Sequence, residues 1–181
     1  GNMAVICMGI DPGVVNVFAK YAATELLDEI TEVHVIDGGN LSVPGADPDD
    51  IMFGFNVWTV LDEVMNPNVE YDKEKGGFIV EKAFAGQEVY EMPEGVGKNT
   101  LVKVEHEEVV TMARYLSQYG LKKATFKISL DENLITALKV LDKLRLRSIK
   151  PVQVGDVKVV PRVVVAACAP QPKDIGERTT A

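Results

Sequence analysis

The sequence predicts an α+β domain in which helices pack on one face of a mixed β-sheet. Helix-like and strand-like segments alternate along both ends of the chain, and a group of short strands separated by glycine turns lies between them. The length of 181 residues suits one domain with a single core. We therefore expect residues 1–181 to form one domain, in which the polar residues 169–181 are an open C-terminal end.

The first third of the chain is predicted to run strand, helix, strand, loop, helix. Residues 4–9 form an apolar run typical of a buried strand, and 13–28 place apolar side chains at helical spacing. Residues 30–36 alternate apolar and polar side chains, which is the period of a strand. Gly, Pro and Asp are frequent in residues 40–51, as in a long loop, and residues 57–65 predict a helix.

The middle of the chain is predicted to be an antiparallel meander. Three short apolar runs at 78–80, 87–90 and 101–104 are separated by turns that contain glycine. A helix over 107–118 follows and ends at Gly120.

The last third predicts two further helices and a hairpin. Residues 124–130 alternate as a strand, and Asp131 is placed to cap a helix that runs to residue 144. Residues 152–160 predict a short hairpin, and Pro161 suits the first turn of a helix that ends at Cys168.

The composition of the chain bears on its binding partners and on the cellular compartment in which we expect it. The formal charge of −8 argues against nucleic acid, because binding phosphates requires clustered Lys and Arg. The two cysteines, Cys7 and Cys168, lie in apolar surroundings, so we expect both to be small buried hydrophobic residues. Two cysteines do not make a disulfide framework, so we expect a cytoplasmic protein. No apolar run approaches the roughly 20 residues that cross a bilayer, so no membrane partner is expected.

A Gly-Ile-Asp-Pro-Gly turn at residues 9–13 is the first candidate site. Ligand sites of open α/β sheets lie where strands end, and glycine allows close approach of the backbone to a ligand. Asp11 would be a carboxylate at a helix start, where N–H groups favour its charged form. An ordinary N-cap turn is the alternative, and it stays open on this motif alone.

The second candidate is the segment from His106 to Arg114. His106 stands at a junction between strand and helix, where an imidazole can donate to a carboxylate or titrate near neutral pH. Glu107 and Glu108 lie in the first helical turn, and Thr111 shares a helix face with Arg114. A capped helix with a solvated acidic turn is the competing interpretation.

A third segment, residues 53–58, holds the single tryptophan, two phenylalanines and an amide before a helix. Trp58 and Asn56 suit a pocket wall with one orienting group, although aromatic residues also simply pack cores. The chain has no His/Cys cluster with the spacing of metal ligands and no Gly-x-Gly-x-x-Gly dinucleotide fingerprint. We therefore expect neither a metal nor a nucleotide site in these residues.

Taken in this order, the three segments resemble the saccharopine dehydrogenase family. Its members carry a Gly-x-Asp-Pro-Gly turn, matched by residues 9–13, and an aromatic helix start, matched loosely by residues 53–58. Many bacterial members have a His-Glu-Glu helix start, matched by residues 106–108 together with Thr111. The resemblance covers nearly the whole chain from about Ala4.

The resemblance implies a domain that binds substrate and forms a dimer. Family members begin with a Rossmann domain, so residues 1–12 would be the junction with that missing domain. The implied fold is similar to the second domain of glyceraldehyde-3-phosphate dehydrogenase, and the bare face of its sheet would form a homodimer. The parent enzyme would use NAD or NADP, held mainly by the missing domain, and no metal.

The implied reaction forms or cleaves a secondary amine that joins an amino acid to an aldehyde, in amino-acid or polyamine metabolism. The chain alone would be inactive and holds no predicted catalytic residue, and Asp11 would pair with an ammonium or amine of the substrate. A homodimerisation or amino-acid-sensing module without catalysis is the alternative. The predicted substrate-binding residues are Asp11, Pro12, Gly13, Asn16, Asn56, Trp58, His106, Glu107 and Thr111.

Overall fold

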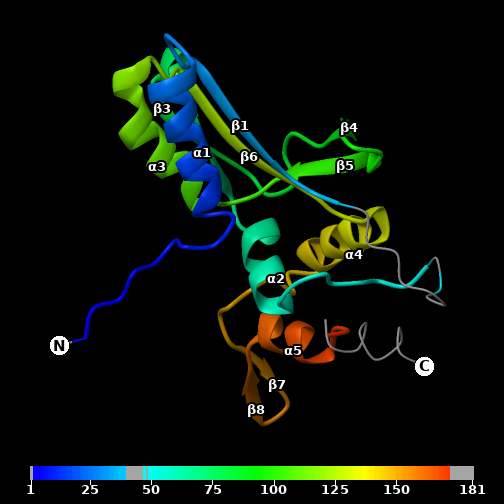
Figure 1. Ribbon diagram of the computed structural model, residues 1–181. Helices are drawn as coiled ribbons and strands as arrows, with labels where there is room; N and C mark the ends of the chain where they lie inside the picture. The colour runs from blue at the N-terminus through cyan, green and yellow to red at the C-terminus, as the bar shows by residue number, and fades with distance from the viewer. Residues whose placement is uncertain (1, 40–46, 48, 172–181) are drawn as a thin grey trace.

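A computed structural model describes residues 2–39, 47 and 49–171 (Figure 1). The helices are α1 (Val14–Tyr21), α2 (Val57–Met65), α3 (Glu107–Leu116), α4 (Glu132–Lys143) and α5 (Pro161–Cys168). The strands are β1 (Glu32–Asp37), β2 (Asn68–Asp72), β3 (Gly77–Glu81), β4 (Glu88–Met92), β5 (Gly97–Lys103), β6 (Lys123–Ser129), β7 (Val152–Val154) and β8 (Val157–Val159).

Strand β6 organises a six-stranded mixed sheet. It pairs in parallel with β1 along one edge, from Lys123 to Ile128. Its other edge pairs antiparallel with β2 near its start and with β5 near its end, and β3 and β4 extend the sheet beyond these two strands. The α+β class predicted from the sequence is confirmed, while the likeness to glyceraldehyde-3-phosphate dehydrogenase stays a prediction.

The core lies between this sheet and the helices. Ala124 and Phe126, on one face of β6, are almost fully buried and belong to the same apolar cluster as Leu61 of α2 and Leu138 of α4. Helices α1 and α3 lie side by side against β6 and β1 in Figure 1. Alternate residues of β6, such as Thr125, stay partly exposed on the opposite face.

Several elements match the sequence predictions closely. Helix α2 begins after Asn56, α4 is capped by the carboxylate of Asp131, and α5 starts at Pro161. The predicted hairpin is β7–β8. The helix predicted over 107–118 is α-helical to Leu116, and a 3₁₀ turn at Ser117–Tyr119 follows it. The predicted helix over 13–28 is α-helical only to Tyr21, and the wider π-type turn Ala22–Leu26 follows it.

Three predictions are wrong. The strand predicted over residues 4–9 is absent: residues 4–8 pair with no described strand, Gly9 forms only an isolated bridge to Gly13, and all six residues are exposed. Cys7 and Cys168 are exposed, not buried. The meander is wrong in its first strand, since β3 pairs with β2, a strand that was not predicted, and lies at the far edge of the sheet from β4, whereas β4 and β5 pair antiparallel as predicted. Of the predicted loop at 40–51 and the C-terminal end at 169–181, residues 40–46, 48 and 172–181 lie outside the described residues.

Candidate functional site

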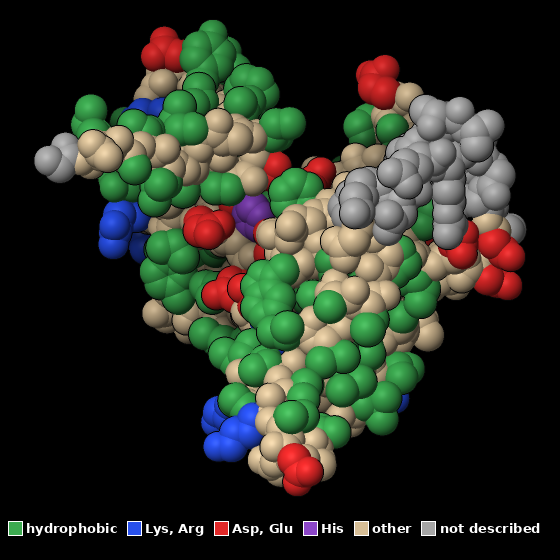
Figure 2. All heavy atoms as spheres, turned by 90° about the horizontal axis from the view of Figure 1, so that it is seen from below, with side chains coloured by type: hydrophobic (Ala, Val, Ile, Leu, Met, Phe, Trp, Pro, Cys, Tyr) green, Lys and Arg blue, Asp and Glu red, His purple; other side chains and the backbone are tan. Residues whose placement is uncertain are grey.

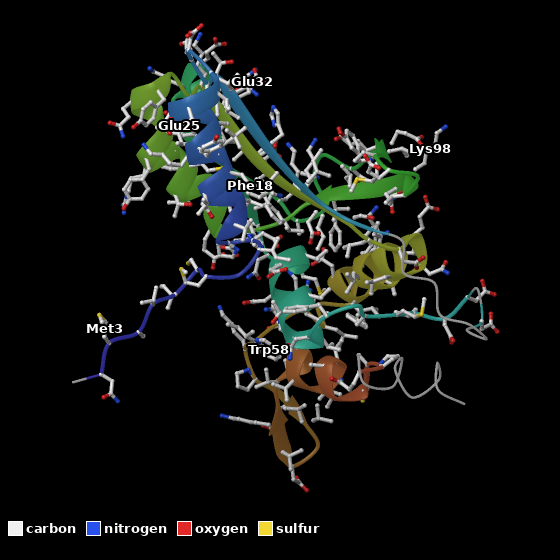
Figure 3. All side chains as sticks on the ribbon, viewed as in Figure 1. Met3, Phe18, Glu25, Glu32, Trp58 and Lys98 are labelled. Atoms are coloured by element: carbon white, nitrogen blue, oxygen red, sulfur yellow. The ribbon has the colours of Figure 1, made fainter. Side chains whose placement is uncertain are left out.

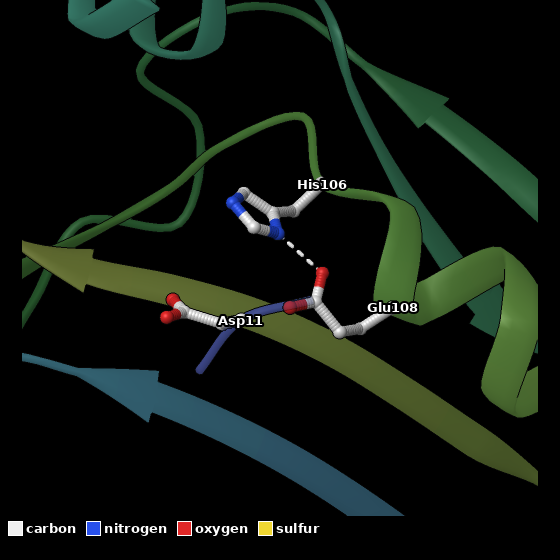
Figure 4. A group of neighbouring side chains, drawn as sticks. All are labelled: Asp11, His106 and Glu108. Atoms are coloured by element: carbon white, nitrogen blue, oxygen red, sulfur yellow. Dashed lines mark hydrogen bonds and ion pairs between the residues drawn. The ribbon is translucent and has the colours of Figure 1, made fainter. Parts of the chain in front are cut away.

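The turn at residues 9–13 is built so that only glycine fits at Gly13. The Gly9 N–H donates to the Pro12 carbonyl at 2.8 Å, and the Val14 N–H donates to the Gly9 carbonyl at 3.0 Å. Gly13 has φ 147°, and a Cβ there would lie 2.1 Å from the Gly9 oxygen. This closed turn holds Asp11 near the start of α1 and close to His106 and Glu108 (Figure 4).

His106 is held from two sides at the start of α3. Its ring stacks on Phe126 of β6, with ring centres 3.9 Å apart and planes at 7°. Its Nδ1 is hydrogen-bonded to the carboxylate of Glu108, as the dashed line in Figure 4 shows. The Glu108 side chain is fully buried, and its second oxygen, Oε1, has no hydrogen-bond partner in the part of the chain that the structure describes. The imidazole therefore has one fixed orientation, with Nε2 as its remaining nitrogen.

A hollow of about 420 Å³ opens beside His106. Figure 2 shows a histidine among acidic side chains in a hollowed part of the surface. Nε2 of His106 lies 3.8 Å from the Glu63 carboxylate, which comes from α2. None of the nine residues that line the hollow is Lys or Arg. They are Trp58, Thr59, Asp62, Glu63, Val69, Glu105, His106, Glu107 and Val110.

The pKa values in this cluster respond to burial and to neighbouring charges. Burial acts to lower the pKa of His106, but its hydrogen bond to Glu108 and the nearby carboxylates outweigh this, so the pKa is raised. Burial raises the pKa of Glu63, helped by other carboxylates and opposed by His106. Burial and the charge of Asp37 raise the pKa of Asp11. No described residue that lines the hollow is Lys or Arg, so His106 is the one basic side chain in that described lining.

Helix α2 lines the hollow with one aromatic side chain, Trp58 (Figure 3), and with three polar ones, Thr59, Asp62 and Glu63. Asn56 caps this helix, because its side-chain oxygen accepts from the Thr59 N–H at 3.1 Å. Trp58 is 40% exposed, and its ring centre lies 5.8 Å from the guanidinium carbon of Arg162. Arg162 of α5 is buried and donates to Asp62, so it fixes this face of α2 beneath the hollow.

Asn16 and Thr111 join the helices that carry the turn and the histidine. The Asn16 amide donates to the Thr111 hydroxyl at 2.9 Å, and its oxygen accepts from the Gly13 N–H at 3.1 Å. The Thr111 hydroxyl also contacts the Glu108 carbonyl at 3.1 Å. These polar groups are engaged within the protein, and neither residue lines the hollow.

Residues 9–180 match the family model for the saccharopine dehydrogenase C-terminal domain. The chain belongs to this family. The match includes the turn with Asp11 and the helix start with His106, so both halves of the candidate site lie within the saccharopine dehydrogenase C-terminal domain.

Curated relatives are similar to this C-terminal domain along nearly its whole length. Carboxynorspermidine synthase from Vibrio cholerae is 26% identical over 176 residues, which cover 97% of this chain and 40% of the relative. Carboxyaminopropylagmatine dehydrogenase from Synechocystis sp. is 25% identical over 177 residues, covering 98% and 42%. Carboxynorspermidine synthase from Vibrio alginolyticus is 26% identical, covering 97% and 40%. The chain thus spans about two fifths of these relatives.

The structure brings Trp58, His106 and Glu107 to the hollow and places Asp11 beside His106. Asn56, Pro12 and Gly13 shape the helix start and the turn, and substrate contacts for all the predicted residues stay a prediction. Sequence reasoning missed Glu63. The available signal is its position on α2. Glu63 follows Thr59 by four residues, so it lies on the same side of the helix, which also carries Trp58 and Asp62.

Sequence reasoning also assigned no role to Glu108. It placed this residue in the first helical turn, with a solvated acidic turn as the competing interpretation, whereas the structure buries the side chain completely. The spacing of two residues from His106 was the available signal, because it brings the carboxylate to Nδ1.

Asp11, His106 and Glu108 each offer one oxygen or nitrogen atom, and these atoms lie within 4.8 Å of one another. That spacing admits either a shared cation or shared protons. Since Nδ1 of His106 is already hydrogen-bonded to Glu108, we interpret the group as a proton-sharing cluster. The absence of a metal stays a prediction. Among the described residues, no helix is long and apolar enough to cross a membrane.

Proposed function

We propose that this saccharopine dehydrogenase C-terminal domain binds the substrate of an NAD(P)-dependent oxidoreductase that forms or cleaves a secondary amine joining an amino acid and an aldehyde. We further propose that the substrate is a carboxylated polyamine. The observation that carries this proposal is that four carboxylates, and no Lys or Arg, are among the described residues that line the hollow.

The hollow suits a ligand with several ammonium groups. Asp62 is already paired with Arg162, but Glu63, Glu105 and Glu107 can each accept charge-assisted hydrogen bonds, which are among the stronger contacts available to a ligand. The ring of Trp58 already has the Arg162 guanidinium 5.8 Å from its centre, and the part of the ring that stays exposed is aromatic surface to which a ligand cation is attracted. The names of the relatives, carboxynorspermidine synthase and carboxyaminopropylagmatine dehydrogenase, support the same substrate class.

The residues of the hollow do not suit a dinucleotide. A pyrophosphate is anionic and binds to helix N-termini, glycine-rich turns or cations, whereas this hollow presents four carboxylates. We therefore derive no step that passes through NAD or NADP at this site. The cofactor belongs, in this proposal, to a part of the enzyme outside the described residues.

A homodimer through the sheet face away from the helices is the second part of the proposal. That face carries charged side chains such as Lys103 and Lys127, each paired with glutamates. Sedimentation of the purified chain at several concentrations measures this. A dimer without amine binding would favour the alternative of a dimerisation module, and binding of free amino acids alone would favour a sensing module.

Calorimetric titration with norspermidine tests the amine site. We expect the wild-type chain to bind it, and Glu63→Gln to weaken binding about tenfold, equivalent to about 1.4 kcal/mol. The matched control is Glu81→Gln, which removes a carboxylate of the sheet face and should leave the affinity unchanged. Absence of norspermidine binding, or an equal loss in both variants, would contradict the proposal.

A further inference from the structure

We propose that His106 is a catalytic base that takes the proton from the ammonium of the substrate, and that Glu108 is the residue that positions it. This inference rests on the proposed function, because it requires an amine substrate in the hollow. It goes further by assigning a proton-transfer step to two residues of this chain.

The hydrogen bond between the two residues determines which nitrogen is basic. A carboxylate only accepts, so Nδ1 of His106 carries a proton toward Glu108 (Figure 4). In the neutral imidazole the lone pair is then on Nε2. Stacking on Phe126 prevents the ring from turning away, so the lone pair keeps one direction.

Nε2 is placed to meet a substrate nitrogen. His106 lines the hollow, and Nε2 lies 3.8 Å from the Glu63 carboxylate. Because hydrogen bonds to nitrogen are about 2.9 Å long, one ammonium can contact both atoms at once. Glu63 would hold the ammonium while Nε2 receives its proton.

Glu108 is suited to a role through His106 and not through the ligand. Its side chain is fully buried and does not line the hollow. A buried carboxylate stabilises the charged imidazolium, as in other carboxylate–histidine pairs. The charged groups that face His106 are Asp11 from the first turn, Glu63 from α2, and Glu107 and Glu108 from α3. All are carboxylates, so they favour the protonated ring.

The step balances without any further reagent. An N–H bond of the substrate ammonium breaks, its electron pair stays on nitrogen as the lone pair of the free amine, and the proton forms an N–H bond at Nε2. The positive charge moves from the substrate to the imidazolium beside Glu108. The free amine can then attack a carbonyl carbon, which an ammonium cannot do. The pKa of an alkylammonium lies above that of an imidazolium, so the proton transfer is unfavourable by the difference between the two. A raised pKa of His106 makes this difference smaller.

The test is the pH dependence of kcat/KM for amine turnover by the complete oxidoreductase. We expect His106→Asn to lower kcat/KM about 100-fold or more and to abolish the acid limb of the profile. Glu108→Gln keeps a hydrogen-bond acceptor without its charge, so it should lower the rate about tenfold and move the acid limb to lower pH by about 1. His34→Asn, at the other histidine, is the matched control and should leave the profile unchanged.

The outcomes separate the two proposals. If wild-type enzyme turns over no amine, the proposed function fails and this inference fails with it. If wild type is active but His106→Asn keeps the rate and the acid limb, only the assignment of the base is overturned. Nitrogen-15 NMR of the chain adds a readout independent of turnover: neutral His106 should carry its proton on Nδ1, and a proton on Nε2 would overturn the role of Glu108.

Discussion

The carboxylates of the sheet face and those of the hollow are neutralised in different ways. On the sheet face, Nζ of Lys103 lies 2.6 Å from Glu70 and 2.8 Å from Glu81, so the chain itself supplies the cation. In the hollow, Asp62 is paired with Arg162, but Glu63 and Glu107 face one imidazole, and no described residue that lines the cavity is Lys or Arg. The first arrangement stabilises the fold, whereas the second leaves room for a cation from outside.

The pKa values show the same contrast. Burial acts to lower the pKa of Lys103, but its hydrogen bonds to Glu70 and Glu81 raise it overall, so the lysine stays charged. In the hollow, burial raises the pKa of Glu63, which means that its charged form is disfavoured. A bound ammonium would relieve that penalty, and this is how the geometry couples to function.

Breaking the lysine network should give the largest effect on stability. Lys103→Met leaves Glu70 and Glu81, both partly buried, without their cation, so we expect the free energy of unfolding to fall by about 2 kcal/mol. Urea denaturation measures this. Lys123→Met removes a more exposed lysine and should change stability by less than about 0.5 kcal/mol. Equal losses would show that the network has no special role.

Removing a charge from the hollow should stabilise the fold, in contrast to removing Lys103 from the sheet face. Glu63→Gln removes a carboxylate whose charge is disfavoured in the folded state, so we expect Tm at pH 7 to rise by about 2 °C. The variant would thus be more stable and bind amines more weakly. Thermal unfolding followed by circular dichroism checks this, and a lower Tm would contradict the idea that the hollow is short of positive charge.

A smaller effect should appear in the pH dependence of stability. The pKa of folded His106 lies above its usual value, so the stabilisation it provides is fully present below about pH 6.5 and is lost as pH rises through the folded value. We expect Tm of wild type relative to His106→Asn to decline as the pH rises above about 6.5. A difference independent of pH would mean that Glu108 does not stabilise the imidazolium.

Elements with strong local signals were predictable from the sequence. Asn56, Asp131 and Pro161 each mark a helix start by capping or by a fixed backbone angle, and the structure has those helices. The strand β2 was missed because its alternation of Asn68, Glu70 and Asp72 with apolar residues looks polar, and because Pro67 precedes it. Its pairing with β3 depends on contacts distant in sequence from any local pattern.

The site was predictable only in part. Asp11 and His106 come from motifs, and the structure places them near each other. Glu63 reaches the cluster from a separate helix, so only the tertiary contact between α2 and the residues just before α3 reveals it. The burial of Glu108 is likewise a tertiary property, since a glutamate in a first helical turn is usually solvated.

The central claim is that the hollow binds the ammonium group of a ligand beside His106. NMR titration of the two histidines, with and without saturating norspermidine, tests it most directly, because His34 serves as an internal reference. An ammonium next to Nε2 should lower the pKa of His106 by about 1 and leave the titration of His34 unchanged. An unchanged pKa of His106 in the presence of bound norspermidine, or a response confined to His34, would contradict the account.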